Sequence, residues 1–576
     1  MQQTFEPLAY DASSVWEPNI VQHISSFLPG NIIAGTLRLV NSKTAKQFSG
    51  IKTISLSVPV PTQTFKDCWG KPECYCTYTR KQRLQILSLT AKSGVIANLE
   101  VALDNAGLVV TSELLKAAAV AGHLDVCVLL RKRGSAWGEA LVAAARGGHR
   151  HVCEWMLASG CPFKASSIYE AARGGHLNLA RWLLHHAIRR RQSVRRGELL
   201  AAAAEGLTLP HLRELHQRIL SSWEDWALGL RRELVDQEKE KELAAAACSP
   251  TPDWQAKVEW LEQLGYVPSV CVGTEIATRQ HPEMAQRLMW LHKRGYPLAQ
   301  DTVLSAARQG DLTALHFLVE EVGFPVHHLQ GIAAYFGQLD VVQCLHSRGG
   351  AQTDPKILVS EAASRGHLSV LIWVMETAQE VTAELVPELL NLAAWSGNKA
   401  LMIWLRQRGW GFTKDAVKRV VLSGCVAALE WLVKDQGCPL PDDGEPYVCA
   451  ADSGDLAMAG CLARLGCPWG VDLVARCFCR STRPRVRVLK LFVELGCPFD
   501  LDAAERAANR IRASPAYYKT EVLDWLMRER KHRGRSERGG LQLEPHLREW
   551  SRRRRTADMC RRTTTVMALA ASSYDA

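Results

Sequence analysis

The sequence predicts an all-α solenoid of stacked helix pairs with short inter-repeat loops and a small helical cap at the N-terminus. The main observation is a recurring pattern. Leu141–Phe163 reads LVAAARGGHRHVCEWMLASGCPF, and similar stretches lie at Ile168–Leu184 and Val359–Val374. Each copy describes an alanine-rich helix, a Gly-His turn and a second helix with an apolar stripe. Self-similarity at a period of roughly 20–50 residues is typical of repeat architectures.

The glycines of the inter-helix turns mark the repeat units, and consecutive ones are 26–31 residues apart within each of two series. The first series is Gly94, Gly122, Gly148, Gly175 and Gly206, and the second is Gly310, Gly337, Gly366, Gly397, Gly424 and Gly454. Two degenerate units lie between the series, around Trp260 and Trp290, and two more follow the second. This count predicts about fifteen units.

Composition places the chain among folded intracellular proteins. Hydrophobic residues make up 47% and charged residues 22%, which excludes disorder throughout. No run approaches the roughly 18 apolar residues of a membrane helix, and the N-terminus lacks a signal peptide's basic start and apolar core. We therefore expect no membrane partner and a cytoplasmic location. The 18 cysteines are spread along the chain, and we expect buried thiols.

Residues 1–50 lack the repeat pattern. Helical spacing of apolar residues in 20–28 ends at Pro29-Gly30, and a second short helix follows. The stretch 16–48 resembles an F-box, whose pattern is Leu-Pro, a helix, an aliphatic-aromatic-Leu-Pro segment and then Leu-x-Leu-Val-Cys-x-x-Trp. The residues that carry the match are Ile24, Phe27, Leu28, Pro29, Leu37, Leu39 and Val40.

The match departs from the F-box pattern at its start, where Trp16-Glu17-Pro18 replaces Leu-Pro, and at Asn41 and Thr44, which replace Cys and Trp. The resemblance implies that these residues bind a Skp-type linker of a ubiquitin ligase. The alternative is a plain helical cap for the open end of the array. Residues 51–81 are predicted to be a linker, and Cys68, Cys74 and Cys76 lack a fourth ligand at zinc-finger spacing, so no cofactor is expected.

From residue 82 to 530 the pattern resembles the ankyrin repeat, Ala-Ala-x-x-Gly-His-x-x-Val-Val-x-x-Leu-Leu-x-x-Gly. Residues 144–160 match it, with Ala144-Ala145, Gly148-His149, Val152 and Leu157 in place. The units are shorter than the usual ~33 residues and lack Thr-Pro-Leu-His. We therefore expect short loops instead of ankyrin fingers, with binding mainly on the inner helices and the loop edge. The predicted segments are repeats at 82–220, a charged helical insert at 221–245 and repeats at 246–530.

Residues that could suggest chemistry fall at structural places of the unit. Tryptophans recur in the second helix and are expected in the core: Trp155, Trp182, Trp260, Trp290, Trp373, Trp404 and Trp431. The turn histidines recur once per unit (His123, His149, His176 and His367), so their copies cannot converge on one pocket, and we expect them to hydrogen-bond backbone. Phosphate-loop, zinc-protease and serine-hydrolase motifs are absent from the sequence. The sequence therefore predicts a non-enzyme.

The C-terminal segment 531–576 is predicted to be a basic, disordered tail. Arg528–Arg562 holds 13 basic and 5 acidic residues, which is +8 of the chain's +11, so the array is nearly neutral. The run Arg552, Arg553, Arg554 and Arg555 is typical of nuclear import or nucleic-acid patches.

The combined pattern predicts a non-catalytic protein–protein interaction protein, in which the repeats recognise a target and the F-box-like module recruits a ubiquitin ligase. Two alternatives remain: an ankyrin scaffold without a ligase link, and a nuclear protein that uses the arginine tail on nucleic acid. Nucleic acid is not expected as a partner of the nearly neutral array.

Overall fold

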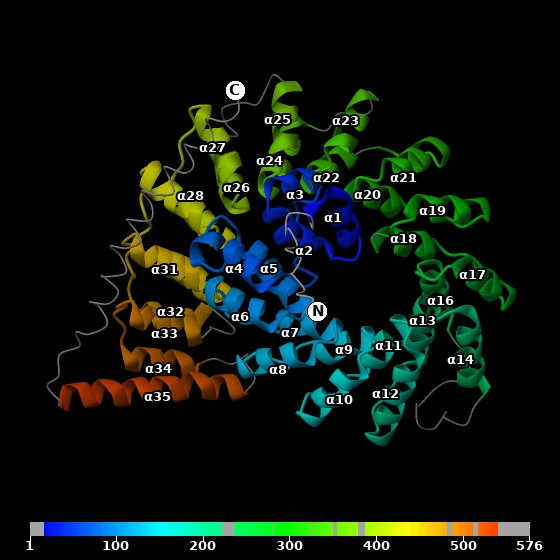
Figure 1. The fold of residues 1–576 in the computed structure, drawn as a ribbon, viewed down its shortest axis with the longest axis horizontal. Coiled ribbons are helices and arrows are strands. Elements are labelled where there is room, and N and C mark those ends of the chain that lie inside the picture. The colour runs from blue at the N-terminus through cyan, green and yellow to red at the C-terminus, as the bar shows by residue number, and fades with distance from the viewer. Residues whose placement is uncertain are drawn as a thin grey trace, which may run out of the picture. The chain divides into compact units, whose positions relative to one another are not determined.

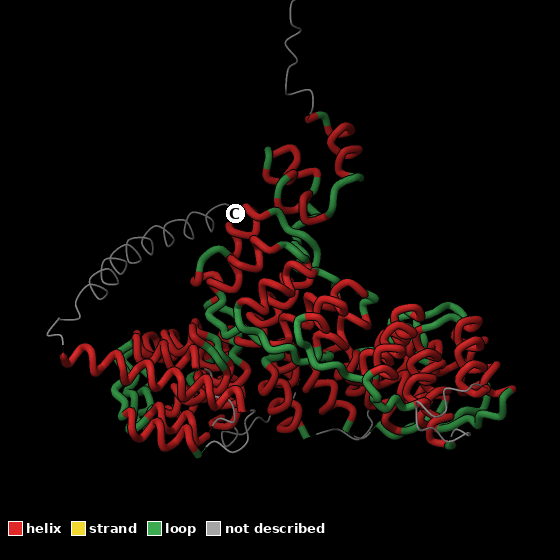
Figure 2. The backbone as a smooth tube through the Cα atoms, turned by 90° about the horizontal axis from the view of Figure 1, so that it is seen from below, coloured by secondary structure: helices red, strands yellow, loops and turns green. Residues whose placement is uncertain are grey.

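A computed structural model describes residues 16–221, 235–279, 281–326, 328–348, 354–377, 386–480, 486–510 and 516–538. Within these ranges the backbone consists of helices joined by loops (Figure 2), and no strand forms apart from one isolated antiparallel bridge between Leu108 and Asp455. The predicted all-α fold class is confirmed. The chain divides into two compact units, the first comprising residues 1–471 and 487–497 and the second comprising residues 472–486 and 498–576.

The first unit is a solenoid whose inner layer consists of the first helix of each pair, each packed on the next (Figure 1). These helices are α5 (Arg80–Ser93), α7 (Ser112–Val120), α9 (Ala140–Arg146), α11 (Ser166–Arg173), α13 (Arg196–Gly206), α16 (Asp236–Ala247), α18 (Val270–Thr278), α20 (Gln300–Gln309), α22 (Leu329–Phe336), α24 (Pro355–Arg365), α26 (Val386–Ser396), α28 (Lys414–Ser423) and α30 (Glu445–Ser453).

The second helices pack against their own first helices and form the other layer. They are α6 (Ile96–Asn105), α8 (Leu124–Lys132), α10 (Arg150–Ala158), α12 (Leu177–Arg189), α14 (Leu209–Ser221), α17 (Trp254–Gln263), α19 (Met284–Lys293), α21 (Leu312–His316), α23 (Leu339–Ser347), α25 (Leu368–Thr377), α27 (Lys399–Gln407), α29 (Val426–Glu430) and α31 (Leu456–Arg464). Most of α33 (Val486–Glu494) also belongs to the first unit. After α21 and α29 the chain continues in short π-helical segments, Phe317–Glu321 and Trp431–Asp435.

Small side chains allow the inner helices to approach one another closely. Ala144 and Ala145 in α9 are fully buried, and so are Val152, Cys153 and Met156 in α10. Alanine adds helix propensity at no cost in side-chain entropy, and the apolar stripe of α10 supplies the burial that a nine-residue helix needs for stability. The predicted turn glycines lie between the two helices of a pair, except Gly206, which is the last residue of α13.

The inter-helix turn locks each unit to the next. Gly122 has φ +81°, a backbone conformation that residues with a Cβ atom rarely adopt. The ring of His149, from the following unit, lies directly over it, and the His149 Nε2–H donates to the Val120 carbonyl oxygen at 3.2 Å. Burial lowers the pKa of His149, which favours the neutral ring. His123 and His367 make the same bond to the Lys92 and Tyr335 carbonyls, so the predicted backbone role is confirmed for these three.

Six of the seven tryptophans predicted in the core lie at its edge. Trp431 is buried, but its six counterparts are only half-buried. They lie on second helices, and in four of them an arginine lies over the indole ring: Trp182, Trp260, Trp290 and Trp404. The shortest of these contacts places the Arg408 guanidinium 3.6 Å from the Trp404 ring centroid. Because Val152, Cys153 and Met156 occupy the fully buried stripe, the adjacent Trp155 is left at its edge.

The solenoid of the first unit closes on itself. The Arg83 side chain of α5 is fully buried and reaches Asp455, 372 residues later, with Nη2 to Oδ2 at 2.5 Å and Nη1 to Oδ1 at 3.2 Å. The same guanidinium donates to the carbonyl oxygens of Ala106 at 2.9 Å and Gly424 at 2.8 Å. Four hydrogen bonds therefore compensate the burial of both charges. Strong contacts are not restricted to adjacent units.

Backbone hydrogen bonds extend the closure on both sides of this ion pair. The Val109 N–H donates to Gly454 O and the Ala457 N–H to Gly107 O, both at 3.1 Å. The Ala427 N–H donates to Cys76 O at 2.8 Å.

The segment 51–81, predicted to be a linker, is therefore a packed part of the array. It forms α4 (Thr62–Trp69) and a short 3-10 helix (Pro72–Tyr75), and it buries Phe65 and Tyr75.

Two other predicted boundaries differ from the structure. The charged insert at 221–245 overlaps α16, whose alanine-rich second half packs between α13 and α18 as an ordinary inner helix. Residues 222–234 lie outside the described ranges. The repeats predicted to run to 530 are divided, because α32 (Leu473–Arg480), α34 (Leu501–Asn509) and α35 (Ala516–Arg538) belong to the second unit. There Arg530 pairs with Asp502 at 2.5 Å and with Glu505 at 3.1 Å.

Candidate binding surfaces

The N-terminal module folds around a small core of its own. It consists of α1 (Pro18–Ser25), α2 (Gly30–Gly35), a 3-10 helix (Leu37–Leu39) and α3 (Ser42–Gln47). Val21, Ile33 and Phe48 form its buried centre, and Leu28 and Leu37 pack against them. Two of the F-box-like residues therefore support the fold of the module.

The remaining F-box-like residues face solvent. Phe27 is 75% exposed, Leu39 70%, Val40 47% and Ile24 41%, while Pro29 is also exposed. Such exposure of large apolar side chains in one short module is typical of an interaction site. We call Ile24, Phe27, Leu39 and Val40 the apolar face.

The module is attached to the array by buried polar side chains. Asn31, only 4% exposed, donates its Nδ2–H to Ser55 O at 2.8 Å and accepts the Ser55 N–H at 2.8 Å through Oδ1. The Thr64 hydroxyl of α4 donates to Gly35 O at 2.8 Å, and Asn98 of α6 donates to Val60 O at 2.8 Å. These bonds form a continuous connection from the module through 55–64 to the first repeat.

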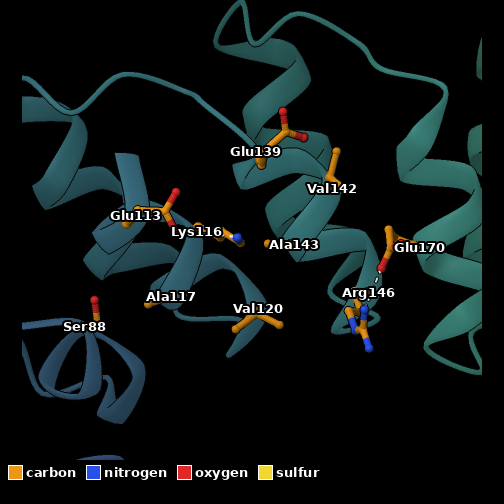
Figure 3. A pocket seen from close by; sticks show the side chains of 10 residues that line it. All are labelled: Ser88, Glu113, Lys116, Ala117, Val120, Glu139, Val142, Ala143, Arg146 and Glu170. Carbon is orange, nitrogen blue, oxygen red and sulfur yellow. Dashed lines mark hydrogen bonds and ion pairs between the residues drawn. The ribbon is translucent and has the colours of Figure 1, made fainter. Parts of the chain in front are cut away.

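The inner helices line a pocket of about 490 Å³ on α5, α7, α9 and α11 (Figure 3). Its walls include Ala117, Val120 and Val142, surrounded by charged side chains. These charges are paired: Lys116 with Glu113 at 3.6 Å, Arg146 with Glu170 at 3.0 Å, and Glu139 with Lys164. The pocket thus offers an apolar floor with a neutralised rim, a surface suited to an apolar side chain of a partner. The short units, which lack ankyrin fingers, predict binding on the inner helices, but the sequence does not identify the individual pocket residues because the pattern varies at exposed positions.

A buried polar cluster connects the degenerate units in the middle of the array. Glu242 of α16 is fully buried and accepts the Tyr266 hydroxyl at 2.8 Å, and His216 of α14 lies 3.3 Å from the same hydroxyl. Burial raises the pKa of Glu242 to about 7 and lowers that of His216. Because Glu242, Tyr266 and His216 are buried, their contacts hold helices of the array together.

The Glu242→Gln substitution is expected to remove a pH dependence of stability. In the native protein the unfolded chain loses the Glu242 proton near pH 4.5, whereas the folded chain retains it to about pH 7. The stability of the native protein therefore falls as pH rises through this window, by up to about 3 kcal/mol. Urea unfolding at several pH values should show the variant gaining stability relative to the native protein between pH 5 and 8. A constant difference across this range would contradict the buried acid.

Among the described residues no group of three or more His, Cys, Asp or Glu side chains is arranged to hold a metal ion. No described helix has both the length and the apolar composition needed to cross a membrane. Arg552, Arg553, Arg554 and Arg555 lie outside the described residues.

No protein-family model and no curated protein matches this chain. Among solved structures, the pentatricopeptide repeat protein PPR10 in complex with an 18-nt psaJ RNA element aligns with 89% of this chain and 87% of its own, at 11% identity and a TM-score of 0.22. A cysteine-to-serine variant of the same complex gives 13% identity with the same coverage and TM-score. At this TM-score the alignment carries no argument about ligand or mechanism. The helix pairs themselves show a helical-repeat solenoid.

Proposed function

We propose that the chain is a non-catalytic recognition protein whose ankyrin-like repeats bind a target protein while the apolar face of the N-terminal module binds a Skp-type linker of a ubiquitin ligase. The observation that carries the ligase part is the exposure of Phe27 and Leu39 at the F-box-like positions. Burial of one large apolar side chain contributes about 1.5–3 kcal/mol, so these two anchors alone supply a substantial part of a binding energy.

The attachment of the module supports an adaptor. A ligase adaptor must hold its target at a defined place relative to the linker, and the hydrogen bonds of Asn31 and Thr64 restrict the module's movement on the first repeat. The turn histidines are compatible with the ankyrin-like assignment, because His149 bonds the backbone of the preceding unit, which is the role expected for it from the sequence.

The experiment is a pull-down of a purified Skp-type linker by the full-length chain and by a Phe27→Ser/Leu39→Ser variant. The native chain should retain the linker, and the variant should lose it, since both substituted side chains are exposed and the module's core of Val21, Ile33 and Phe48 is unchanged.

A matched control is Val267→Ser, which removes an apolar side chain that is 74% exposed elsewhere in the array. It should bind like the native chain. Failure of the native chain to bind the linker would sink the ligase role and favour a repeat scaffold capped by the module.

A further inference from the structure

The closure of the solenoid creates a second pocket, of about 800 Å³. One wall comes from residues 77–85, at the start of α5, and the other from residues 364–423, at the turns that follow α24, α26 and α28. Gly424 brings the walls together, because a Cβ atom on it would lie 2.6 Å from the Arg80 Cβ. We call this cavity the closure pocket.

The charged residues that line the closure pocket are all basic: Arg80, Lys81, Arg365 and Lys399. Arg80 donates its Nε–H to Ser453 O at 2.8 Å. Among the described residues no carboxylate lies within ion-pair distance of Lys81, Arg365 or Lys399. Gathered cations in a concave site raise the local concentration of anions, in contrast to the paired charges of the pocket on α5–α11.

Most neutral polar groups of the pocket are already used within the fold. The Ser396 and Ser423 hydroxyls each donate to a backbone carbonyl of their own helix, at 2.7 Å. Asn398 Nδ2 donates to Gly366 O at 2.8 Å. Lys81, Arg365 and Lys399 therefore carry charge that no carboxylate of the described residues neutralises, although the Arg365 guanidinium also stacks 4.2 Å from the Tyr335 ring centroid. These three cations favour a negatively charged ligand.

Apolar surface lies beside these cations. Trp395 of α26 is 47% exposed and Leu422 of α28 is 42% exposed, and both line the pocket. A ligand that fills the site needs an apolar group next to its anionic groups.

A nucleic-acid strand fits this arrangement poorly. Strand binding uses a basic groove that follows several phosphates, whereas here the cations are confined to one pocket. Gln85 lines the closure pocket, and Ser88, about one turn further along α5, lines the neighbouring pocket with its Glu113, Glu139 and Glu170. Because these carboxylates are paired with cations, the neighbouring pocket offers no continuous basic track along which a strand could extend from α5.

We propose that the closure pocket binds an acidic peptide segment of a partner protein, in which carboxylate or phosphate groups flank an apolar side chain. The cations bind the anionic groups, and Trp395 with Leu422 receives the apolar side chain. This inference rests on the proposed protein-recognition role of the repeats and names the class of segment that they recognise. Because the two walls come from opposite ends of the array, binding also requires a closed solenoid.

The test measures fluorescence anisotropy of labelled peptides with the full-length chain. The peptide probes are Glu-Glu-Leu-Glu-Glu and three versions of it: one with phosphoserine in place of each Glu, one with Gln in place of each Glu, and one with Gly in place of Leu. A single-stranded oligouridine is the nucleic-acid probe. We expect saturable binding of one or both acidic probes, weakened by salt, and little binding of the Gln peptide. The two acidic probes distinguish carboxylate from phosphate recognition.

Arg365→Gln/Lys399→Gln is expected to weaken binding of the acidic probe by about tenfold or more, since it removes two of four cations. The matched control, Lys132→Gln/Lys293→Gln, removes two exposed charges outside the pocket and should leave binding unchanged. Trp395→Ala should weaken binding of the leucine peptide more than that of its glycine counterpart.

Three results would overturn the proposal: no saturable binding of either acidic probe, equal binding by the two double variants, or tighter binding of oligouridine that the pocket variant abolishes. The Skp-linker pull-down reports separately on the module, so retention of the linker without peptide binding would reject the closure pocket alone.

Discussion

Asp455→Ala is expected to lower the free energy of unfolding of the first unit by about 3–5 kcal/mol, because it leaves the buried Arg83 guanidinium without its counter-charge. Both side chains of this pair are 1% exposed. The substitution also removes the acceptor for the Met458 N–H, which caps α31 at 2.9 Å. Urea unfolding followed by circular dichroism would measure the total loss.

Asp311→Ala separates the loss of the cap from the loss of the closure. Asp311 follows a turn glycine as Asp455 does and caps α21 through the Ala314 N–H at 3.0 Å. Among the described residues it forms no ion pair with a buried arginine. This control substitution should lower the free energy of unfolding by about 1 kcal/mol. Equal losses in the two variants would show that the Arg83–Asp455 pair adds nothing beyond the cap.

Hydrogen exchange would show whether the closure couples the two ends of the array. In an open solenoid only neighbouring repeats interact, so Asp455→Ala would expose amides around α30 and α31 alone. With closure, α5 and α7 should lose protection in the same variant although they lie more than 300 residues earlier in the sequence. Unchanged protection in α5 would contradict a closed ring of repeats.

The sequence was sufficient to predict the helix pairs because each pair depends on local signals. Gly122 ends one helix, Val126 and Leu130 supply the buried stripe of the next, and the period repeats. Closure could not be predicted in the same way. Whether Arg83 meets Asp455 depends on small rotations summed over all intervening repeats, and no local pattern records that sum.

Individual site residues were harder to predict for a related reason. Trp155 and Met156 are adjacent in the sequence and both apolar, yet Met156 is fully buried while Trp155 is half-buried. A helical pattern identifies the apolar side of a helix but not which residue lies at its centre. Lys81 and Lys399 resemble ordinary solvated lysines in the sequence, and only the fold brings them to one pocket.

Gly122→Ala is the second substitution with a large expected effect, about 3 kcal/mol of unfolding free energy. Two costs add. An L-residue at φ +81° is strained by about 1–2 kcal/mol. The new Cβ would also lie 2.4 Å from His149 Nδ1, so the ring must move and its hydrogen bond to Val120 O is lost. Thermal and urea unfolding would both report the change.

Gly134→Ala, at the other end of α8, isolates the first of these costs. Gly134 has φ +89°, and nothing lies within 4 Å of the position of its Cβ. The free energy of unfolding of this variant should fall only by the backbone strain energy, about 1–2 kcal/mol.

Combining Gly122→Ala with His149→Ala should lower the free energy of unfolding by less than the sum of the two single substitutions, because the clash disappears with the ring. If the two losses of unfolding free energy add, His149 moves aside freely in Gly122→Ala. The turn would then depend on the backbone conformation of glycine alone, and the His149 contact would not hold one repeat to the next.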